Sequence, residues 1–166
     1  FGGNNHSRIH PFLTSGSSFN YRGAEGWWKS DGYDLSRVAG RMVSGDLNGD
    51  GRDDVATLYN YGSSQSAIHV FLCSGATFDY CGAEGWWSST SYDSGPVADR
   101  MVAGHYNGDG KDDIAVFYDY GSGESRIHVW LSTGTSLQYQ GGTGWWSGTG
   151  YSLSQIANRM VAGDFN

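Results

Sequence analysis

The sequence predicts an all-β fold, and its composition and patterning carry this prediction. Glycine accounts for 27 of the 166 residues and aromatic residues for 15%, while only 16% are charged. Short apolar runs alternate with polar residues and are separated by turn residues, and no segment shows the apolar periodicity of an α-helix. These features favour many short strands joined by tight turns. The chain is long enough to form one domain with its own hydrophobic core.

A gap-free repeat of 59 residues runs through the chain. Isoleucine recurs at this spacing as Ile9, Ile68 and Ile127. The same spacing relates three histidines, His10, His69 and His128, and three tryptophan pairs, Trp27-Trp28, Trp86-Trp87 and Trp145-Trp146. Repeats of this length are typical of propellers and other repeat architectures, in which each unit is covered by its neighbours.

Four strands are expected in each repeat. In the second repeat they are Met42–Gly45 and residues 55–61, 67–72 and 77–81, after which Trp86 and Trp87 lead into a longer polar connection. Apolar residues occur on both sides of the third strand, as expected where a sheet is covered on both faces. The sequence therefore predicts a β-propeller built of four-stranded antiparallel blades. A β-sandwich is the alternative, but sandwiches rarely repeat in a fixed register.

The repeat divides the chain into a single propeller segment with uneven ends. Residues 1–40 form a partial blade, 41–99 and 100–158 form two blades, and 159–166 form the first strand of a further blade. Three full periods need 11 residues more than the chain contains. We therefore expect either a fragment of a longer propeller or a chain that completes its ring with other copies or segments.

An oxygen-rich loop follows the first strand of the second repeat. Its sequence is Asp46-Leu47-Asn48-Gly49-Asp50-Gly51-Arg52-Asp53-Asp54. Calcium takes six to eight oxygen ligands at about 2.3–2.6 Å, so oxygen-bearing side chains at alternate positions of a tight loop suit it. The expected ligands are the side chains of Asp46, Asn48, Asp50 and Asp54 and the carbonyl of Arg52. The alternative is a metal-free hairpin turn rich in Asn, Asp and Gly.

The third repeat contains the run Arg100-Met101-Val102-Ala103-Gly104, followed by Asn107-Gly108-Asp109-Gly110-Lys111-Asp112-Asp113-Ile114-Ala115-Val116. This pattern resembles the FG-GAP repeat of integrin α-subunit propellers and of many secreted bacterial proteins, and is similar to the repeats of mushroom propeller lectins. The resemblance covers nearly the whole chain. It implies a propeller of roughly seven blades, with calcium held in the hairpin between the first two strands of a blade.

Matching positions give two further candidate calcium loops. In the second loop the ligands would be Asn107, Asp109, Asp113 and the carbonyl of Lys111, but His105 stands where the first aspartate should be. A neutral imidazole is a poor ligand for a hard cation, so we expect this loop to bind calcium weakly or not at all. In the third loop Asp164 and Asn166 are present and the remaining ligands are absent.

The tryptophan pairs are the candidate ligand-binding residues. Adjacent strand residues point to opposite faces, so one ring of each pair is expected to pack between blades and the other to offer a flat apolar face to a sugar. The candidates are Trp27, Trp28, Trp86, Trp87, Trp145 and Trp146. The three histidines are expected to pack between blades with their rings hydrogen bonded. No residues suggest a nucleophile with its base, so no catalysis by this chain is expected.

The net charge limits the classes of binding partner, and the calcium loops and cysteines bear on the compartment in which the protein functions. A net charge of −7 argues against nucleic acid and anionic membranes as partners, and no stretch approaches the eighteen apolar residues of a membrane span. Cys73 and Cys81 flank a turn and could form a disulfide across a hairpin or remain free thiols. Calcium loops of millimolar-range affinity belong outside the cytosol, so we expect a secreted protein.

The lectin resemblance implies a function. It points to a secreted, calcium-stabilised propeller that binds a glycan or polysaccharide and has no catalytic activity of its own. The alternatives are a protein-binding adhesion module, as integrin heads imply, and an accessory propeller domain of a larger secreted hydrolase or polysaccharide lyase. The fold cannot decide among these, because function resides in sites that different members of a fold do not share.

Overall fold

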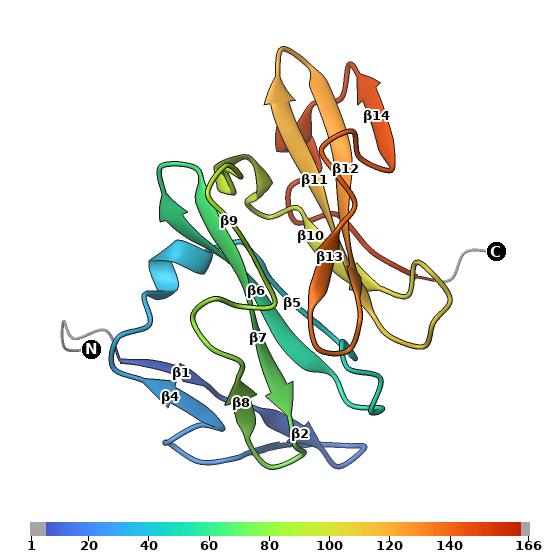
Figure 1. Ribbon diagram of the computed structural model, residues 1–166. Coiled ribbons are helices and arrows are strands. Elements are labelled where there is room, and N and C mark those ends of the chain that lie inside the picture. Colours follow the sequence, from blue (N-terminus) through green and yellow to red (C-terminus); the bar gives the residue numbers. More distant parts are fainter. Residues whose placement is uncertain (1–5, 164–166) are drawn as a thin grey trace.

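The structure is a computed structural model that describes residues 6–163 (Figure 1). Within this range the chain forms antiparallel strands and three short 3-10 helices, and it has no α-helix. The all-β prediction is confirmed. No helix in the described range is long and apolar enough to cross a membrane. Asp164 and Asn166, two of the predicted metal ligands, lie outside the described residues.

The second repeat forms a five-stranded antiparallel sheet at the centre of the molecule (Figure 1). Strands β5, β6 and β7 pair in that order, and β8 and β9 pair with opposite halves of β7. The short strands β8 and β9 therefore act as one interrupted outer strand. The bounds are β5 (Met42–Gly45), β6 (Asp54–Gly62), β7 (Gln65–Cys73), β8 (Phe78–Tyr80) and β9 (Trp87–Ser89).

The strand β9 corrects the expectation that the chain leaves the sheet after Gly82. A turn closed by a hydrogen bond from Gly85 N to Gly82 O returns the chain to β7, and Trp86 N then donates to Ile68 O at 2.8 Å. Gly85 has a φ of +67°, and a Cβ there would collide with Ile68 O. Only glycine allows this close approach, which places Trp87 within the sheet.

The third repeat repeats this topology, and the first contains only its outer half. The third sheet consists of β10 (Met101–Gly104), β11 (Asp113–Gly121), β12 (Glu124–Ser132), β13 (Leu137–Tyr139) and β14 (Trp146–Thr149). In the first repeat, β1 (Ser7–Ile9) pairs with β4 (Trp28–Ser30), and β2 (Phe12–Thr14) pairs with β3 (Phe19–Tyr21). The 3-10 helices η1 (Leu35–Val38), η2 (Gly95–Val97) and η3 (Leu153–Gln155) lie in the connections that follow. Residues 159–163, expected to begin a further strand, are not in a strand.

Outer strands of neighbouring repeats meet through the same contact at both junctions. Phe78 N, at the start of β8, donates a hydrogen bond to Trp27 O at 3.0 Å. One repeat later, Leu137 N at the start of β13 donates to Trp86 O at 3.0 Å. The two junctions are therefore built alike.

Inner strands and connections also meet through repeated contacts. Asp99 N donates to Gly40 O at 2.6 Å, and Asn158 N donates to Asp99 O at 2.7 Å. Strands β5 and β10 run close together. A Cβ added at Gly45 would lie only 3.0 Å from the Cβ of Ala103. These contacts recur at the 59-residue spacing, so successive repeats contact one another through equivalent residues.

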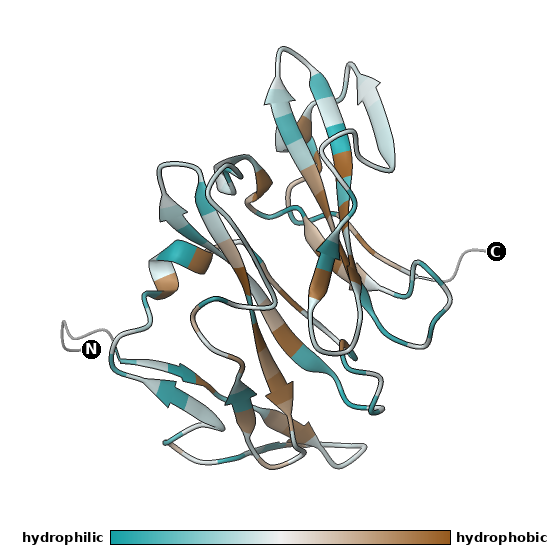
Figure 2. Cartoon of the chain, viewed as in Figure 1, coloured by the Kyte–Doolittle hydropathy of each residue, from teal (hydrophilic) through white to brown (hydrophobic). Residues whose placement is uncertain are grey.

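The hydrophobic core lies between the sheets, and Figure 2 marks hydrophobic residues along the middle of β6, β7 and β12. The second and third sheets bury one common cluster between them. Its members include Leu58, Ile68, Val70, Val97, Ile114, Val116 and Trp130. A smaller cluster between the first and second repeats contains Tyr33, Val38, Tyr59 and Phe71.

The two cysteines are free and do not form a disulfide. The register of β7 and β8 places Phe78 opposite Cys73. Cys81 lies further along the outer strand, where its N–H donates to Val70 O at 3.0 Å. The two thiols are thus attached to different rungs of the hairpin, which is why the turn at residues 74–77 does not bring them together.

Candidate functional site

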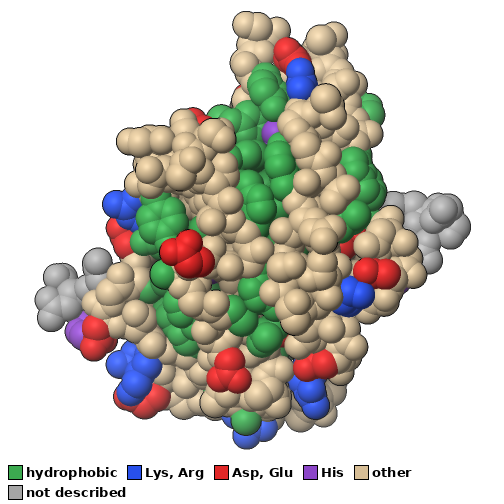
Figure 3. Space-filling model, in the orientation of Figure 1, with side chains coloured by type: hydrophobic (Ala, Val, Ile, Leu, Met, Phe, Trp, Pro, Cys, Tyr) green, Lys and Arg blue, Asp and Glu red, His purple; other side chains and the backbone are tan. Residues whose placement is uncertain are grey.

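Two pockets of about 430 and 390 Å³ open at equivalent places between neighbouring repeats. Both volumes fall within the range of small-ligand sites. The first pocket is lined by the aromatic residues Trp28, Tyr33, Tyr59, Tyr61, His69 and Tyr80. The second is lined by their counterparts one repeat later, Trp87, Tyr92, Tyr118, Tyr120, His128 and Tyr139. Figure 3 shows hydrophobic side chains, with a histidine just visible among them, in hollows of this face.

The second tryptophan of the first two pairs forms a wall between two repeats. The Trp28 ring packs edge-on against Phe71 of the next sheet, with centroids 4.8 Å apart. The Trp87 ring packs in the same way against Trp130 at 5.2 Å. Both indoles are half-buried, and each also lines a pocket. Packing against a neighbouring repeat and exposure to a pocket, expected of separate rings in each pair, therefore occur at the same ring.

The other predicted tryptophans lie elsewhere. Trp27 packs against Phe78, with ring centroids 5.8 Å apart, and Trp86 packs against the core between the second and third sheets. Neither lines the two aromatic pockets. Trp145 and Trp146, in the third repeat, are exposed. Of the six candidates, the structure places Trp28 and Trp87 in the pockets.

A buried histidine closes the bottom of each pocket. In the second pocket, His128 Nδ1 is hydrogen bonded to the Tyr92 hydroxyl at 3.0 Å, and Nε2 to the Tyr120 hydroxyl at 3.1 Å. In the first pocket, His69 makes the corresponding bond to Tyr33 at 3.0 Å. The expectation of packed, hydrogen-bonded rings is confirmed for these two histidines. His10, in the first repeat, is exposed.

Burial controls the charge in the pockets. Desolvation lowers the pKa of His128 to about 4 and also lowers the pKa of His69, so both imidazoles are neutral at pH 7. Desolvation raises the pKa of Tyr33 and of Tyr92, so these hydroxyls keep their protons. The pocket bottoms are therefore uncharged. The Tyr120 side chain is partly exposed, and its hydroxyl also donates to Gly142 O at 3.3 Å.

The rims of the two pockets are polar and differ from each other. Ser88, Ser89 and Ser91 line the second pocket, together with Asp93. The first pocket has Lys29 in place of Ser88, and its ammonium group pairs with Glu25 at 2.7 Å. Hydroxyls beside flat aromatic rings suit a neutral polar ligand with an apolar face.

Sequence reasoning missed the tyrosines that complete these pockets. Tyr33 and Tyr92 lie in the polar connections, which the sequence indicates only as crossing loops. A signal was available, because these two residues and Tyr151 follow the same spacing of 59 residues. A repeated aromatic residue inside a polar connection indicates a contact that each junction needs.

In the first predicted calcium loop, the carboxylate of Asp46 organises the backbone. Asp46 Oδ1 accepts hydrogen bonds from Gly49 N at 2.8 Å and Asp50 N at 3.0 Å, and Oδ2 accepts one from Gly51 N at 2.7 Å. The Asn48 side-chain oxygen accepts a bond from Asp50 N at 2.8 Å. These contacts wrap the loop around its oxygen atoms.

Asp54 closes this loop from the start of β6. Its buried carboxylate accepts hydrogen bonds from Leu47 N at 3.2 Å and Cys73 N at 2.8 Å. Burial, together with the smaller effect of the charges of Asp50 and Asp46, raises the pKa of Asp54 to about 6. A cation among these oxygens would offset that repulsion. The donors are all oxygen and fit calcium, although no three acidic, histidine or cysteine side chains in residues 6–163 already converge closely enough to hold a metal.

The second loop keeps the same backbone with different chemistry. His105 Nε2 accepts the hydrogen bond from Gly110 N, at 2.6 Å, that Asp46 accepts in the first loop. Lys111 Nζ lies 2.9 Å from Asp109 Oδ2, which matches the ion pair of Arg52 with Asp50 in the first loop at 3.2 Å. Asp113 accepts a bond from Ser132 N at 2.8 Å and is buried like Asp54. The ligand set of this loop fits calcium poorly at one position, because the ring nitrogen of His105 replaces the carboxylate oxygens of Asp46.

No family model, curated protein or solved structure matches the chain. The roles of the repeated pockets and loops are therefore inferred from the sequence and geometry of this chain alone.

Proposed function

We propose that the chain is part of a secreted, calcium-stabilised β-propeller of the FG-GAP type that binds carbohydrate between its repeats. The junction contacts support the propeller arrangement. They recur with the 59-residue period in the outer strands and in the inner connections, as a similar rotation between successive repeats would require. Continued rotation about the inner strands arranges sheets as blades around an axis.

Calcium would have a structural role in this protein. It would be held by the side chains of Asp46, Asn48, Asp50 and Asp54 and by the carbonyl of Arg52, and it would rigidify the hairpin between β5 and β6. Sites of millimolar-range affinity function outside cells, where calcium is abundant, and this supports secretion. The second loop, with His105, holds its shape by hydrogen bonds and needs no cation.

The two equivalent aromatic pockets carry the assignment of carbohydrate binding. Sugars present C–H faces that stack on aromatic rings, and their hydroxyls need short polar partners. Trp87, the Tyr120 hydroxyl and the rim serines offer this combination in the second pocket. Repeated pockets on one molecule favour weak individual sites that act together on a polyvalent glycan or polysaccharide. Both pocket histidines hold tyrosine hydroxyls, and we assign the pockets to binding without catalysis.

A glycan array with a blocking variant tests this proposal. The chain is applied with calcium, alongside Ser88→Trp, which places an indole over the rim of the second pocket. The matched control is Ser147→Trp, at the equivalent exposed position of the third repeat, where no following sheet encloses a pocket within residues 6–163. Glycan binding that weakens in Ser88→Trp and persists in Ser147→Trp supports the proposal. A silent array, or equal binding by both variants, would overturn it.

A further inference from the structure

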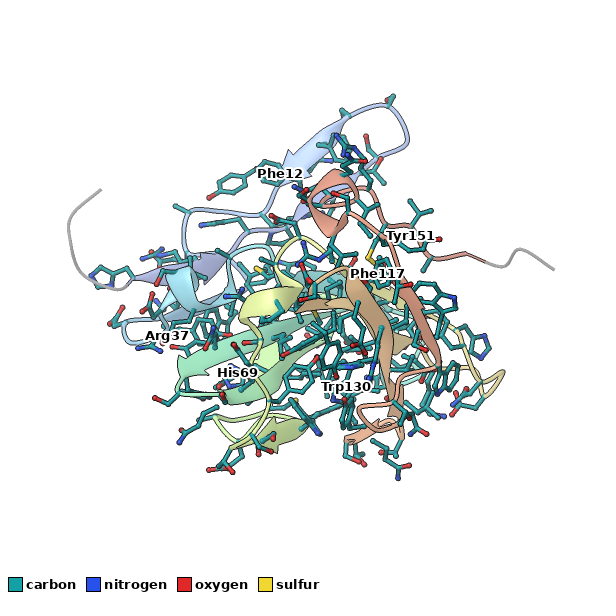
Figure 4. All side chains as sticks on the ribbon, turned by 90° about the horizontal axis from the view of Figure 1, so that it is seen from above. Phe12, Arg37, His69, Phe117, Trp130 and Tyr151 are labelled. Carbon is teal, nitrogen blue, oxygen red and sulfur yellow. The ribbon has the colours of Figure 1, made fainter. Side chains whose placement is uncertain are left out.

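The two ends of the repeat array expose aromatic side chains that are covered elsewhere in the chain. At the N-terminal end, Phe12 and Phe19 have exposed fractions of 59% and 76%. At the C-terminal end, the exposed fraction is 37% for Trp146 and 51% for Tyr151. Figure 4 shows Phe12 on the first repeat, at the edge of the molecule, while Trp130 lies among the side chains between the sheets. We call these the N-face, marked by Phe12, and the C-face, marked by Trp146.

The repeat identifies what covers each of these faces. Trp146 is the third member of the series Trp28 and Trp87, whose rings pack on Phe71 and Trp130 of the following sheet. Phe12 is the member of the series Phe71 and Trp130 that precedes them. Within residues 6–163, no further member of these series covers the Trp146 ring or the Phe12 ring.

The hydrogen-bonded tyrosine and histidine of each junction also come from two different repeats. Tyr92 of one repeat bonds to His128 of the next at Nδ1. The residues at the corresponding positions are Tyr151 on the C-face and His10 on the N-face, and they do not bond to each other within one chain. His10 Nδ1 is instead hydrogen bonded to the Tyr21 hydroxyl of its own repeat, at 3.0 Å. The nitrogen that a preceding repeat would hold is satisfied locally.

The N-face also carries the strands that a junction uses. The ring under Trp28 belongs to β7, and the N–H that bonds to Trp27 O belongs to β8. The first repeat retains the counterparts of these two strands as β2 and β3. It can therefore supply both the aromatic contact and the backbone hydrogen bond that the C-face lacks.

We propose that copies of this chain associate head to tail, with the C-face of one copy covering the N-face of a second copy. Trp146 then packs on Phe12, and Tyr151 approaches His10 in place of Tyr21. The contact joins the counterparts of the tryptophan, tyrosine and histidine that line the pockets of other junctions. The interface joins two different surfaces, and association can continue beyond a dimer. This inference does not depend on sugar binding.

Paired variants test the interface. Sedimentation equilibrium at increasing concentration is measured for the unaltered chain, for Trp146→Asp, for Phe12→Asp and for an equimolar mixture of the two variants. We expect the mass of the unaltered chain to rise with concentration and each variant alone to stay monomeric. The mixture should give a 1:1 dimer and nothing larger, because only the intact C-face of Phe12→Asp and the intact N-face of Trp146→Asp can meet.

The controls separate loss of the interface from misfolding and from non-specific aggregation. Circular dichroism should match that of the unaltered chain for both variants. The melting temperature should be unchanged in Phe12→Asp and somewhat lower in Trp146→Asp, because Trp146 also packs on Phe117 and Tyr151 of its own repeat. An unaltered chain that stays monomeric up to its solubility limit contradicts the proposal and leaves these faces to other segments or to solvent. Self-association that persists in either single variant also contradicts it, because that behaviour requires a face to pair with itself. The readout contains no glycan, so failure here is distinct from failure of the proposed function.

Discussion

Replacing Tyr92 with phenylalanine isolates one hydrogen bond at the junction between the second and third repeats. The change keeps the ring that packs edge-on against Trp87 and Trp130 and removes the hydroxyl that lies 3.0 Å from His128 Nδ1. His128 is almost completely buried, so water cannot readily replace the lost partner. Leaving a buried polar group without its partner costs about 1–3 kcal/mol. For a chain of this size each kcal/mol lowers the melting temperature by about 2–4 °C.

Tyr151→Phe is the matched control, because Tyr151 is the equivalent residue of the third repeat and is half exposed. Its hydroxyl can bond to water, so its removal should change the free energy of unfolding by less than about 0.5 kcal/mol. Urea unfolding followed by tryptophan fluorescence measures both variants. Equal effects of the two substitutions would refute the conclusion that the tyrosine and histidine bond stabilises the junction.

Three further predictions concern the loop, the buried histidine and the glycine turn. Calorimetric titration should detect one more calcium per chain in His105→Asp than in the unaltered chain, and an unchanged stoichiometry would contradict the role assigned to His105 in the second loop. The free energy of unfolding should fall as the pH drops from about 6.5 toward about 4, since the unfolded chain protonates His128 before the folded chain does. The loss of stability with falling pH should be smaller in His128→Asn than in the unaltered chain. Comparing these two proteins isolates the contribution of His128 from that of buried Asp54, whose raised pKa makes the folded chain more stable as the pH falls. Gly85→Ala should lower the melting temperature more than Gly82→Ala. Both glycines have positive φ, but only at Gly85 would a Cβ collide with a backbone oxygen, that of Ile68. Equal losses of melting temperature in the two variants would contradict this reasoning.

The repeat allowed much of the strand order to be predicted. Its period aligns turn glycines and alternating apolar residues in each unit, and β5 to β8 lie close to their expected ranges. The strand β9 was missed because Trp86 and Trp87 are adjacent aromatics without alternation, and because the turn that precedes them resembles the end of a sheet. Pairing of this segment depends on Ile68, which is distant in sequence.

The positions of individual side chains could be predicted less well from the sequence. The spacing of Cys73 and Cys81 allows a disulfide, but strand register decides the outcome and places Phe78 opposite Cys73. Trp87 is a candidate for either packing or ligand contact, and the angle between neighbouring sheets gives it both environments. Such angles arise from packing between repeats, which a sequence pattern does not specify.

Carbohydrate binding between the repeats is tested most directly by an NMR titration of the indole N–H signals of the tryptophans, with the glycan that binds best on the array. Each indole has its own signal, assigned by single Trp→Phe replacement. We predict that the signals of Trp28 and Trp87 shift as glycan is added, while those of exposed Trp145 and buried Trp130 stay in place. Shifts confined to Trp145 and Trp146, or no shift at Trp28 and Trp87, would contradict the assignment of the pockets between repeats as the binding sites.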